Sequence, residues 1–302
     1  MTQASVSAHG VSKFHSTGVA LLFVLPALCL FTAFALVPTL AVLQYSFTKW
    51  DGISKVKEWV GLANYAGLFT DKVFWEAFLN TLEWSAIVVA VNVGLGLVAA
   101  AVLARLGRGR VFIQTCFMVP VVMAPITTAI IWRWMYQPDG PLNLSLIGLG
   151  LEQFVMPWLG NPHTALPAIA IAHCWSTIGL SIVIFLAGLQ AIDEELYDAA
   201  IIDGASPIQT FWHVTLPAMR PVTAVVTVLT VTHAFKEFDL VWAMTKGGPV
   251  RASEILSTYM FKRGAIENNY GYGAAIAVAL LVIVTSAMGI YAWLQRRAEG
   301  QP

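Results

Sequence analysis

The sequence predicts an all-α integral membrane protein with six transmembrane helices and a structured aqueous segment between the fourth and the fifth. Of its 302 residues, 58% are hydrophobic and only 11% are charged, and the mean hydropathy is +0.71. Soluble domains carry about 25% charged residues, so this chain has too few polar groups to coat a water-facing surface. Apolar runs long enough to cross a hydrocarbon core of roughly 30 Å recur along the chain. An acidic stretch interrupts them once.

Six apolar runs define the expected spans. The first is longer than the roughly 7–15 apolar residues of a secretory signal, so we expect it to be an uncleaved span. Pro120 and Pro125 interrupt the third. The spans lie within a permease domain of residues 19–297, between tails at 1–18 and 298–302, and cover about 19–43, 75–103, 111–136, 162–189, 220–244 and 272–294.

The orientation of these spans is left open by counting charges. With both termini inside, the inner segments hold seven Lys or Arg residues and the outer segments hold nine. The positive-inside rule applies to charges close to span ends. The dense turn Arg105–Arg110 and the pair Arg296-Arg297 therefore favour a cytoplasmic position for both termini.

Composition also excludes several classes of function. The formal net charge is zero and no basic stripe is visible, which argues against a nucleic-acid partner. No CxxC, HExxH, GxSxG or Walker pattern occurs in the sequence, so we expect no catalytic residue, no metal site and no cofactor in this chain.

The acidic stretch, which we call the acidic loop (residues 190–219), carries paired start and stop signals for two short helices. Asp193 can cap the first helix, with Glu194 and Glu195 in its first turn. Gly204 suits a left-handed helix stop. Ser206 and Gln209 match a capping box around Pro207. The loop is therefore expected to be a helix, a glycine turn and a second helix.

The spacing in this loop resembles the cytoplasmic signature of the permease subunits of binding-protein-dependent ABC importers. That signature reads Glu-Ala-Ala, three residues, Gly, nine residues, Ile, any residue, Leu-Pro. Here Asp198-Ala199-Ala200 is followed by Gly204, Val214 and Leu216-Pro217 with every spacing kept. Asp replaces Glu at 198 and Val replaces Ile at 214; both conserve the chemistry. Further stretches are similar to the carbohydrate-type (maltose and glycerol-phosphate permease-like) members, namely residues 47–52, 60–65, 78–81, 244–249 and 270–275.

This resemblance implies a type I ABC importer permease fold in a bacterial cell membrane, with the acidic loop acting as a coupling helix docked on a cytoplasmic ATPase. It also implies a second homologous permease subunit, an ATPase dimer that binds ATP and Mg, and an extracytoplasmic solute-binding protein that delivers a sugar. The coupling residues that it implies are Glu195, Asp198, Ala199, Ala200, Asp203, Gly204, Ala205, Leu216 and Pro217.

Polar side chains at membrane depth are the candidates for the substrate pathway, because burying them in lipid is costly. Sugars are bound by carboxylates, amides and flat aromatic faces. An equally open alternative is that these groups form ion pairs and hydrogen bonds between helices, for example Lys236 with Asp239. The candidates are Glu83, Asn92, Trp175, His233, Glu237, Phe238 and Asp239.

Two rival functions remain open. An importer of the same class could carry a glycerol-phosphate-type cargo, which would favour Arg or Lys along the path; Lys236 is the only deep cation. An ATPase-independent secondary transporter is the other alternative. Such transporters commonly contain internal repeats, and we find none.

Overall fold

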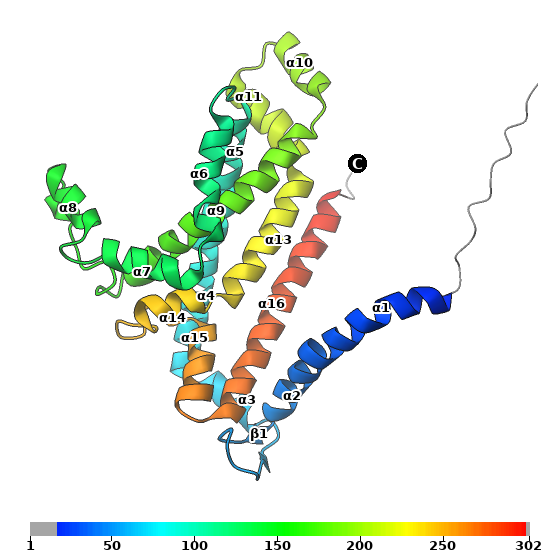
Figure 1. The fold of residues 1–302 in the computed structure, drawn as a ribbon, viewed down its shortest axis with the longest axis vertical. Helices are drawn as coiled ribbons and strands as arrows, with labels where there is room; N and C mark the ends of the chain where they lie inside the picture. Colours follow the sequence, from blue (N-terminus) through cyan, green and yellow to red (C-terminus); the bar gives the residue numbers. More distant parts are fainter. Residues whose placement is uncertain (1–16, 300–302) are drawn as a thin grey trace, which may run out of the picture.

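The computed structural model describes residues 17–299 and confirms the predicted all-α membrane class (Figure 1). Within these residues, four helices are long and apolar enough to cross a membrane, and the number rises to six if two sharply bent helix pairs each count as one span. The predicted tail 1–18 lies almost wholly outside the described residues, as do residues 300–302 of the C-terminal tail.

The first span is a long arm made of α1 (Thr17–Phe31), the π-helical η1 (Thr32–Leu36) and α2 (Val37–Tyr45). Figure 1 shows it projecting away from the other helices. Phe23 is 81% exposed and Phe34 is 78% exposed, which suits a lipid or a partner helix rather than water. The arm rejoins the bundle where α2 packs on α16 (Tyr270–Glu299).

The bundle is built around α9 (Ala165–Gln190) and the continuous helix formed by α4 (Lys72–Val89), η2 (Ala90–Leu95) and α5 (Gly96–Ala104). Phe185 and Ile182 of α9 are fully buried together with Ala100 of α5. Small side chains on α5 let the two helices approach closely, as expected for packing without a hydrophobic driving force.

The predicted third span, 111–136, is interrupted near Pro120 and Pro125, as the sequence indicated. It consists of α6 (Arg110–Met118), the short η3 (Pro120–Val122) and α7 (Pro125–Met135), with a bend of 103° before α7. Met123 and Ala124 are extended, because a residue before proline is pushed out of the helical region and Pro125 has no N–H to donate. In Figure 1, α7 therefore leaves the bundle sideways and leads to α8 (Pro141–Gly148) and η4 (Glu152–Phe154).

Close contact between α6 and α9 depends on Gly179. A Cβ built at this position would lie 2.1 Å from the carbonyl oxygen of Phe117. Any side chain there would push the two helices apart, since the atom it meets belongs to the backbone.

The predicted fifth span, 220–244, is also interrupted. Helix α13 (Arg220–Lys236) ends at an extended Glu237, and α14 (Asp239–Thr245) begins after Phe238. Oε1 of Glu237 accepts a hydrogen bond of 2.9 Å from the backbone N–H of Leu240, so a polar side chain caps the start of the new helix. This local satisfaction of a backbone donor is the physical reason that the break is tolerated.

The end of the bundle opposite the acidic loop carries the remaining elements. A two-stranded hairpin pairs β1 (Thr48–Lys49) with β2 (Glu58–Trp59) in antiparallel register. It is followed by α3 (Ala63–Thr70). Helix α15 (Leu256–Phe261) and the π-helical η6 (Lys262–Ile266) lead into α16. Figure 1 shows the last turns of α16 at the same end of the molecule as the acidic loop.

Candidate functional site

The first half of the acidic loop is the capped helix that the sequence predicts. Helix α10 (Glu194–Ile202) begins after Asp193, whose Oδ1 accepts a hydrogen bond of 3.1 Å from the N–H of Glu195. Glu194 and Glu195 occupy the first turn, where carboxylates interact favourably with the positive end of the helix dipole.

Gly204 ends this helix in the left-handed conformation, with φ +70°. The N–H of Ala205 donates to the carbonyl of Ala200 at 2.9 Å, and the N–H of Gly204 donates to that of Ile201 at 3.0 Å. These two bonds form a Schellman motif. A Cβ at Gly204 would meet nothing within 4 Å, so the backbone conformation, not space, demands glycine here.

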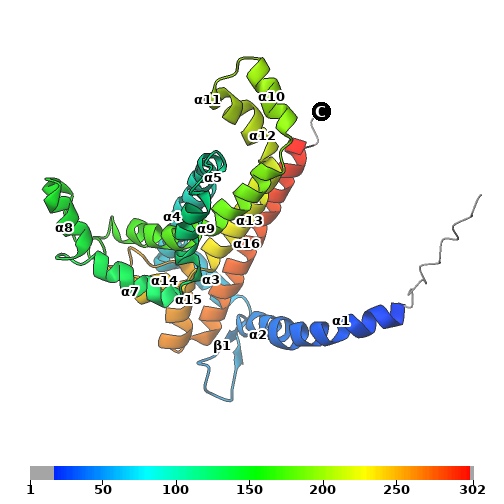
Figure 2. The ribbon, with the colours of Figure 1, turned by 45° about the horizontal axis from the view of Figure 1, so that its top comes forward.

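The second half of the loop is a helical run from Pro207 to Ala218, made of α11 (Pro207–Thr210), the π-helical η5 (Phe211–Thr215) and α12 (Leu216–Ala218). The predicted capping box is present: Gln209 accepts from the N–H of Ser206 at 2.8 Å, and the Ser206 hydroxyl accepts from that of Gln209 at 3.4 Å. The run is bent by 69° from α13, so it lies across the end of that helix (Figure 2).

The loop folds back on itself and leaves one side uncovered. The hydroxyls of Tyr197 and Thr215 are 3.2 Å apart and join its two halves. Ile201 and Ile202 of α10 are 71% and 84% exposed. These apolar side chains lie at an exposed turn, where they are available for contact with another surface.

All nine predicted coupling residues lie in this loop, but on different sides of it. Glu195, Asp198, Ala199, Asp203 and Gly204 are exposed. By contrast, Ala200 is buried, while Ala205, Leu216 and Pro217 are half-buried. Leu216 packs against the cluster of buried side chains between α5, α9 and α13.

A second candidate site, which we call the polar cavity, has a volume of about 260 Å³ between η2, α9 and α13. Neutral polar side chains and apolar ones line it together. Asn92 is anchored there: its Nδ2 donates to the carbonyl of Val88 at 3.0 Å, and its Oδ1 accepts from the hydroxyl of Thr177 at 3.2 Å. The polar lining residues are Asn92, His173, Ser176, Thr177, Ser181, Thr230 and His233.

The polar cavity includes only two of the predicted pathway residues, Asn92 and His233. Glu83 is exposed on α4, whereas its neighbour Trp84 is fully buried beside His173, with ring centroids 5.2 Å apart. Trp175 packs edge-on against Trp132 with the centroids 5.9 Å apart.

The remaining predicted pathway residues lie at the helix break. Phe238 stacks on Trp242 at 5.7 Å, and Asp239 is exposed at the start of α14. The proposed pair of Lys236 with Asp239 is not among the ion pairs of residues 17–299. Instead, Glu237 contacts Nδ1 of His173 on α9 at 3.3 Å. A polar contact between helices therefore exists, but with a different partner from the predicted one.

The predicted pathway residues do not include the polar stripe of α9. His173, Thr177 and Ser181 follow one another at four-residue steps, and Ser176 lies beside them. Residues at this spacing share one helix face, so the spacing alone could have identified this wall.

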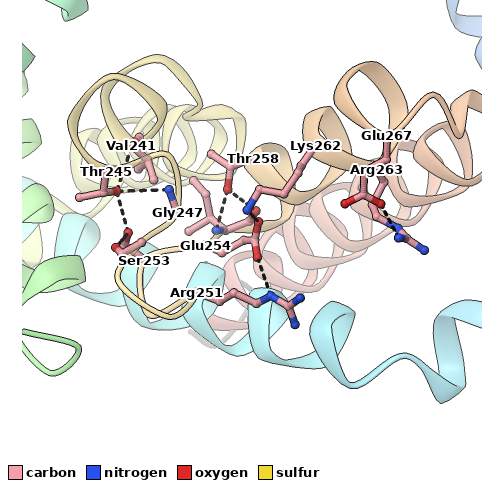
Figure 3. Close-up of polar contacts among 12 residues, drawn as sticks. Val241, Thr245, Gly247, Arg251, Ser253, Glu254, Thr258, Lys262, Arg263 and Glu267 are labelled. Carbon is pink, nitrogen blue, oxygen red and sulfur yellow. Dashed lines mark hydrogen bonds and ion pairs between the residues drawn. The ribbon is translucent and has the colours of Figure 1, made fainter.

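Another polar cluster, which we call the outer network, surrounds Glu254 (Figure 3). Glu254 is 1% exposed and pairs with Lys262, while Arg251 Nε lies 3.8 Å from its other oxygen. Asn80 of α4 donates to the Glu254 carbonyl at 3.0 Å. These contacts attach the 246–255 segment to α4 and η6.

Asp71 completes the outer network. It caps α4 by accepting from the N–H of Val73 at 2.9 Å, and it also accepts from the hydroxyls of Tyr259 at 2.5 Å and Tyr272 at 2.6 Å. Burial opposes ionisation of this carboxyl, but these hydrogen bonds outweigh it and hold the pKa of Asp71 below its ordinary value. One ionised carboxylate thus connects α4, α15 and α16.

Comparison with known proteins identifies a matching family model and solved structures with the same fold. The model described as "Binding-protein-dependent transport system inner membrane component" matches residues 92–300. The trehalose/maltose transport system permease protein MalF of Thermococcus litoralis is 32% identical over 92% of this chain and 94% of its own. The sn-glycerol-3-phosphate transport system permease protein UgpA of Yersinia pseudotuberculosis is 32% identical over 87% and 89%. In the crystal structure of a bacterial ABC transporter that imports alginate, one chain superposes with a TM-score of 0.81 at 22% identity, covering 93% of this chain and 96% of that one.

Proposed function

Because this chain belongs to the family of binding-protein-dependent transport system inner membrane components, we propose that it forms part of the translocation pathway of an ATP-driven sugar importer. The cargo is a sugar or an oligosaccharide, which an extracytoplasmic binding protein delivers. The curated relative that serves trehalose and maltose supports this choice.

The acidic loop is the observation that carries the proposal. Its first helix is capped at Asp193 and stopped at Gly204, and it presents Ile201, Ile202 and several carboxylates outward. A helix whose start and stop are both determined by its own residues, and whose apolar side chains are exposed, is suited to insertion into a partner protein. We assign that partner to a cytoplasmic ATPase dimer, which would bind ATP and Mg while this chain itself catalyses no reaction.

The neutral lining of the polar cavity supports a neutral cargo. Among the described residues that line it, none is Lys, Arg, Asp or Glu. A glycerol phosphate would need cationic groups along its path. The UgpA relative keeps that cargo as the second candidate, and Lys236, exposed just beyond the cavity, is the group that would serve it.

The proposed importer also has a defined assembly and a defined orientation in the membrane. A second, homologous permease subunit would close the pathway, and the exposed first span would lie against lipid or against that subunit. The acidic loop and both termini would face the cytoplasm. The end that carries the hairpin and the outer network would then face the binding protein.

Reconstitution tests this proposal directly. The chain is co-expressed with its partner permease, the ATPase and the binding protein, and uptake of radiolabelled maltose or trehalose into vesicles is measured with and without ATP. We expect uptake that requires both ATP and the binding protein. Uptake that continues without the ATPase would instead establish a secondary transporter, and uptake of glycerol phosphate alone would establish the second cargo.

A further inference from the structure

Two hollows flank the side chain of Arg105 where α5 meets the acidic loop. Their volumes are about 420 Å³ and about 280 Å³. Both are lined by Ala101, Arg105, Pro207 and Phe211. They are therefore two sides of one groove that runs between the last turns of α5 and the helical run 207–218.

The smaller hollow is apolar. Apart from Arg105, it is lined by Val98, Val102, Ile208 and Trp212 together with the shared residues. These four side chains are all exposed. Such a surface needs a hydrophobic neighbour, because uncovered apolar surface of this kind is rarely left to water.

The charge at the head of the groove is positive and uncompensated. Arg105 is exposed and forms no ion pair with another of the described residues. No Asp or Glu is found among the residues lining either hollow. The occupant that complements an unpaired cation beside an apolar hollow is an anion with an apolar tail.

The position of the groove matches the level of lipid headgroups. The run 207–218 is bent by 69° from α13 and lies across its end, and it carries the exposed Trp212. Tryptophan is enriched at the boundary between lipid and water. Basic pockets between helices at the cytoplasmic boundary suit anionic lipid headgroups.

We propose that this groove binds an anionic phospholipid. The phosphate lies at Arg105, and an acyl chain runs along Val98, Val102 and Ile208. A lipid held in this way contacts α5 and the acidic loop together, so it supports the loop from the membrane side. The inference rests on the proposed function only for the leaflet concerned, which is the cytoplasmic one.

Native mass spectrometry of the complete importer tests this site. The complex is purified in detergent, incubated with either dioleoylphosphatidylglycerol or dioleoylphosphatidylcholine, and the retained lipids are counted. We expect the wild type to prefer phosphatidylglycerol. Arg105→Gln should weaken that binding about fivefold, the contribution of one basic residue at an anionic surface, whereas Arg105→Lys should retain most of it.

Two matched controls separate a site from diffuse attraction. Arg108→Gln removes the same charge from the same turn but lies outside both hollows, so retention should not change. Val102→Trp should fill the groove and reduce retention, while Leu95→Trp, at another exposed position of the same span, should not. Equal losses in Arg105→Gln and Arg108→Gln, or equal retention of the two lipids by the wild type, would overturn the proposal.

The readout is independent of transport. An importer that retains phosphatidylglycerol through Arg105 but carries no sugar would leave the lipid site standing and reject the proposed function. An importer that carries sugar without this lipid preference would reject the lipid site and leave the proposed function standing.

Discussion

The acidic loop and the helix break at Glu237 are both polar interruptions of a very apolar chain, yet they are determined in different ways. The helix boundaries of the loop are made by neighbours in sequence: Asp193 caps its own helix and Gly204 stops it. At the break the local cap on Leu240 is joined by a contact to another helix, because Glu237 also reaches His173 on α9. The difference shows that helix boundaries can be encoded locally, whereas a contact between helices requires the assembled bundle.

The largest expected effect is on the acidic loop. In Gly204→Pro, φ cannot reach +70°, and the Schellman bond donated by the Gly204 N–H is lost. The substitution therefore costs about 3 kcal/mol in the conformation that the loop adopts. If the ATPase binds this conformation, its association should weaken roughly hundredfold. Co-purification of the ATPase with the membrane complex measures this.

Gly150→Pro is the matched control for Gly204→Pro. Gly150 also has a positive φ, +72°, but lies in the connection after α8, so its replacement should leave ATPase association intact. Full ATPase stoichiometry in Gly204→Pro would contradict the assignment of the loop. Asp198→Lys, which reverses an exposed charge without backbone strain, should also reduce association while membrane insertion is retained.

The next largest effect is expected at the helix break near Glu237. Glu237→Ala removes both the cap on Leu240 and the partner of His173. Breaking a buried pair by deleting one partner costs about 3 kcal/mol or more, so the thermal midpoint of the detergent-solubilised complex should fall by several degrees.

The comparison variant is Asp239→Ala, at an exposed position only two residues away. Its midpoint should stay near that of the wild type. If the two variants melted alike, the pair with His173 would not hold the break.

A smaller effect is expected inside the polar cavity. Thr177→Val removes the hydroxyl that supports Asn92 at 3.2 Å. Loss of one hydrogen bond is worth about 1 kcal/mol, so the uptake rate should fall about fivefold, with the sugar affinity of the binding protein unchanged. Thr227→Val, on α13 but outside the cavity lining, should transport normally; equal losses in both variants would argue against a pathway role.

The smallest effect concerns the pH dependence of the outer network. The pKa of Asp71 is lowered in the folded chain, so its ionised form stabilises the fold above the ordinary Asp pKa of about 3.9, and this contribution is lost as the pH falls through the lowered value. Asp71→Asn should therefore be less stable than the wild type at pH 7, and the difference should shrink below about pH 4. Thermal melts across this range would show a constant difference if the carboxylate has no such role.

The sequence predicted the helix caps of the acidic loop because each cap needs only residues within a few positions of one another. The prolines at 120 and 125 signalled an interruption, but not that α7 would turn through 103°. That angle arises at Met123 and Ala124, which are extended, and proline alone does not set its size. Similarly, the residue type of Glu237 suggested a buried polar role, yet only the packed bundle brings His173 to it.

The outer network was missed for the same reason. Glu254 and Lys262 lie in different elements, and the contact of Glu254 with Asn80 joins residues 174 positions apart. Patterns of period 2 or 3.6 detect elements; they do not detect which loops an ion pair joins.

Helix α13 connects the acidic loop to the polar cavity. It starts at Arg220, directly after the helical run of the acidic loop, and continues unbroken for 17 residues to Lys236, a length of about 25 Å. Thr230 and His233, near its far end, line the polar cavity. The helix thus joins the loop at one end to the cavity wall at the other, so a displacement of the loop would be transmitted along it, and its far end is held at the break by the contacts of Glu237.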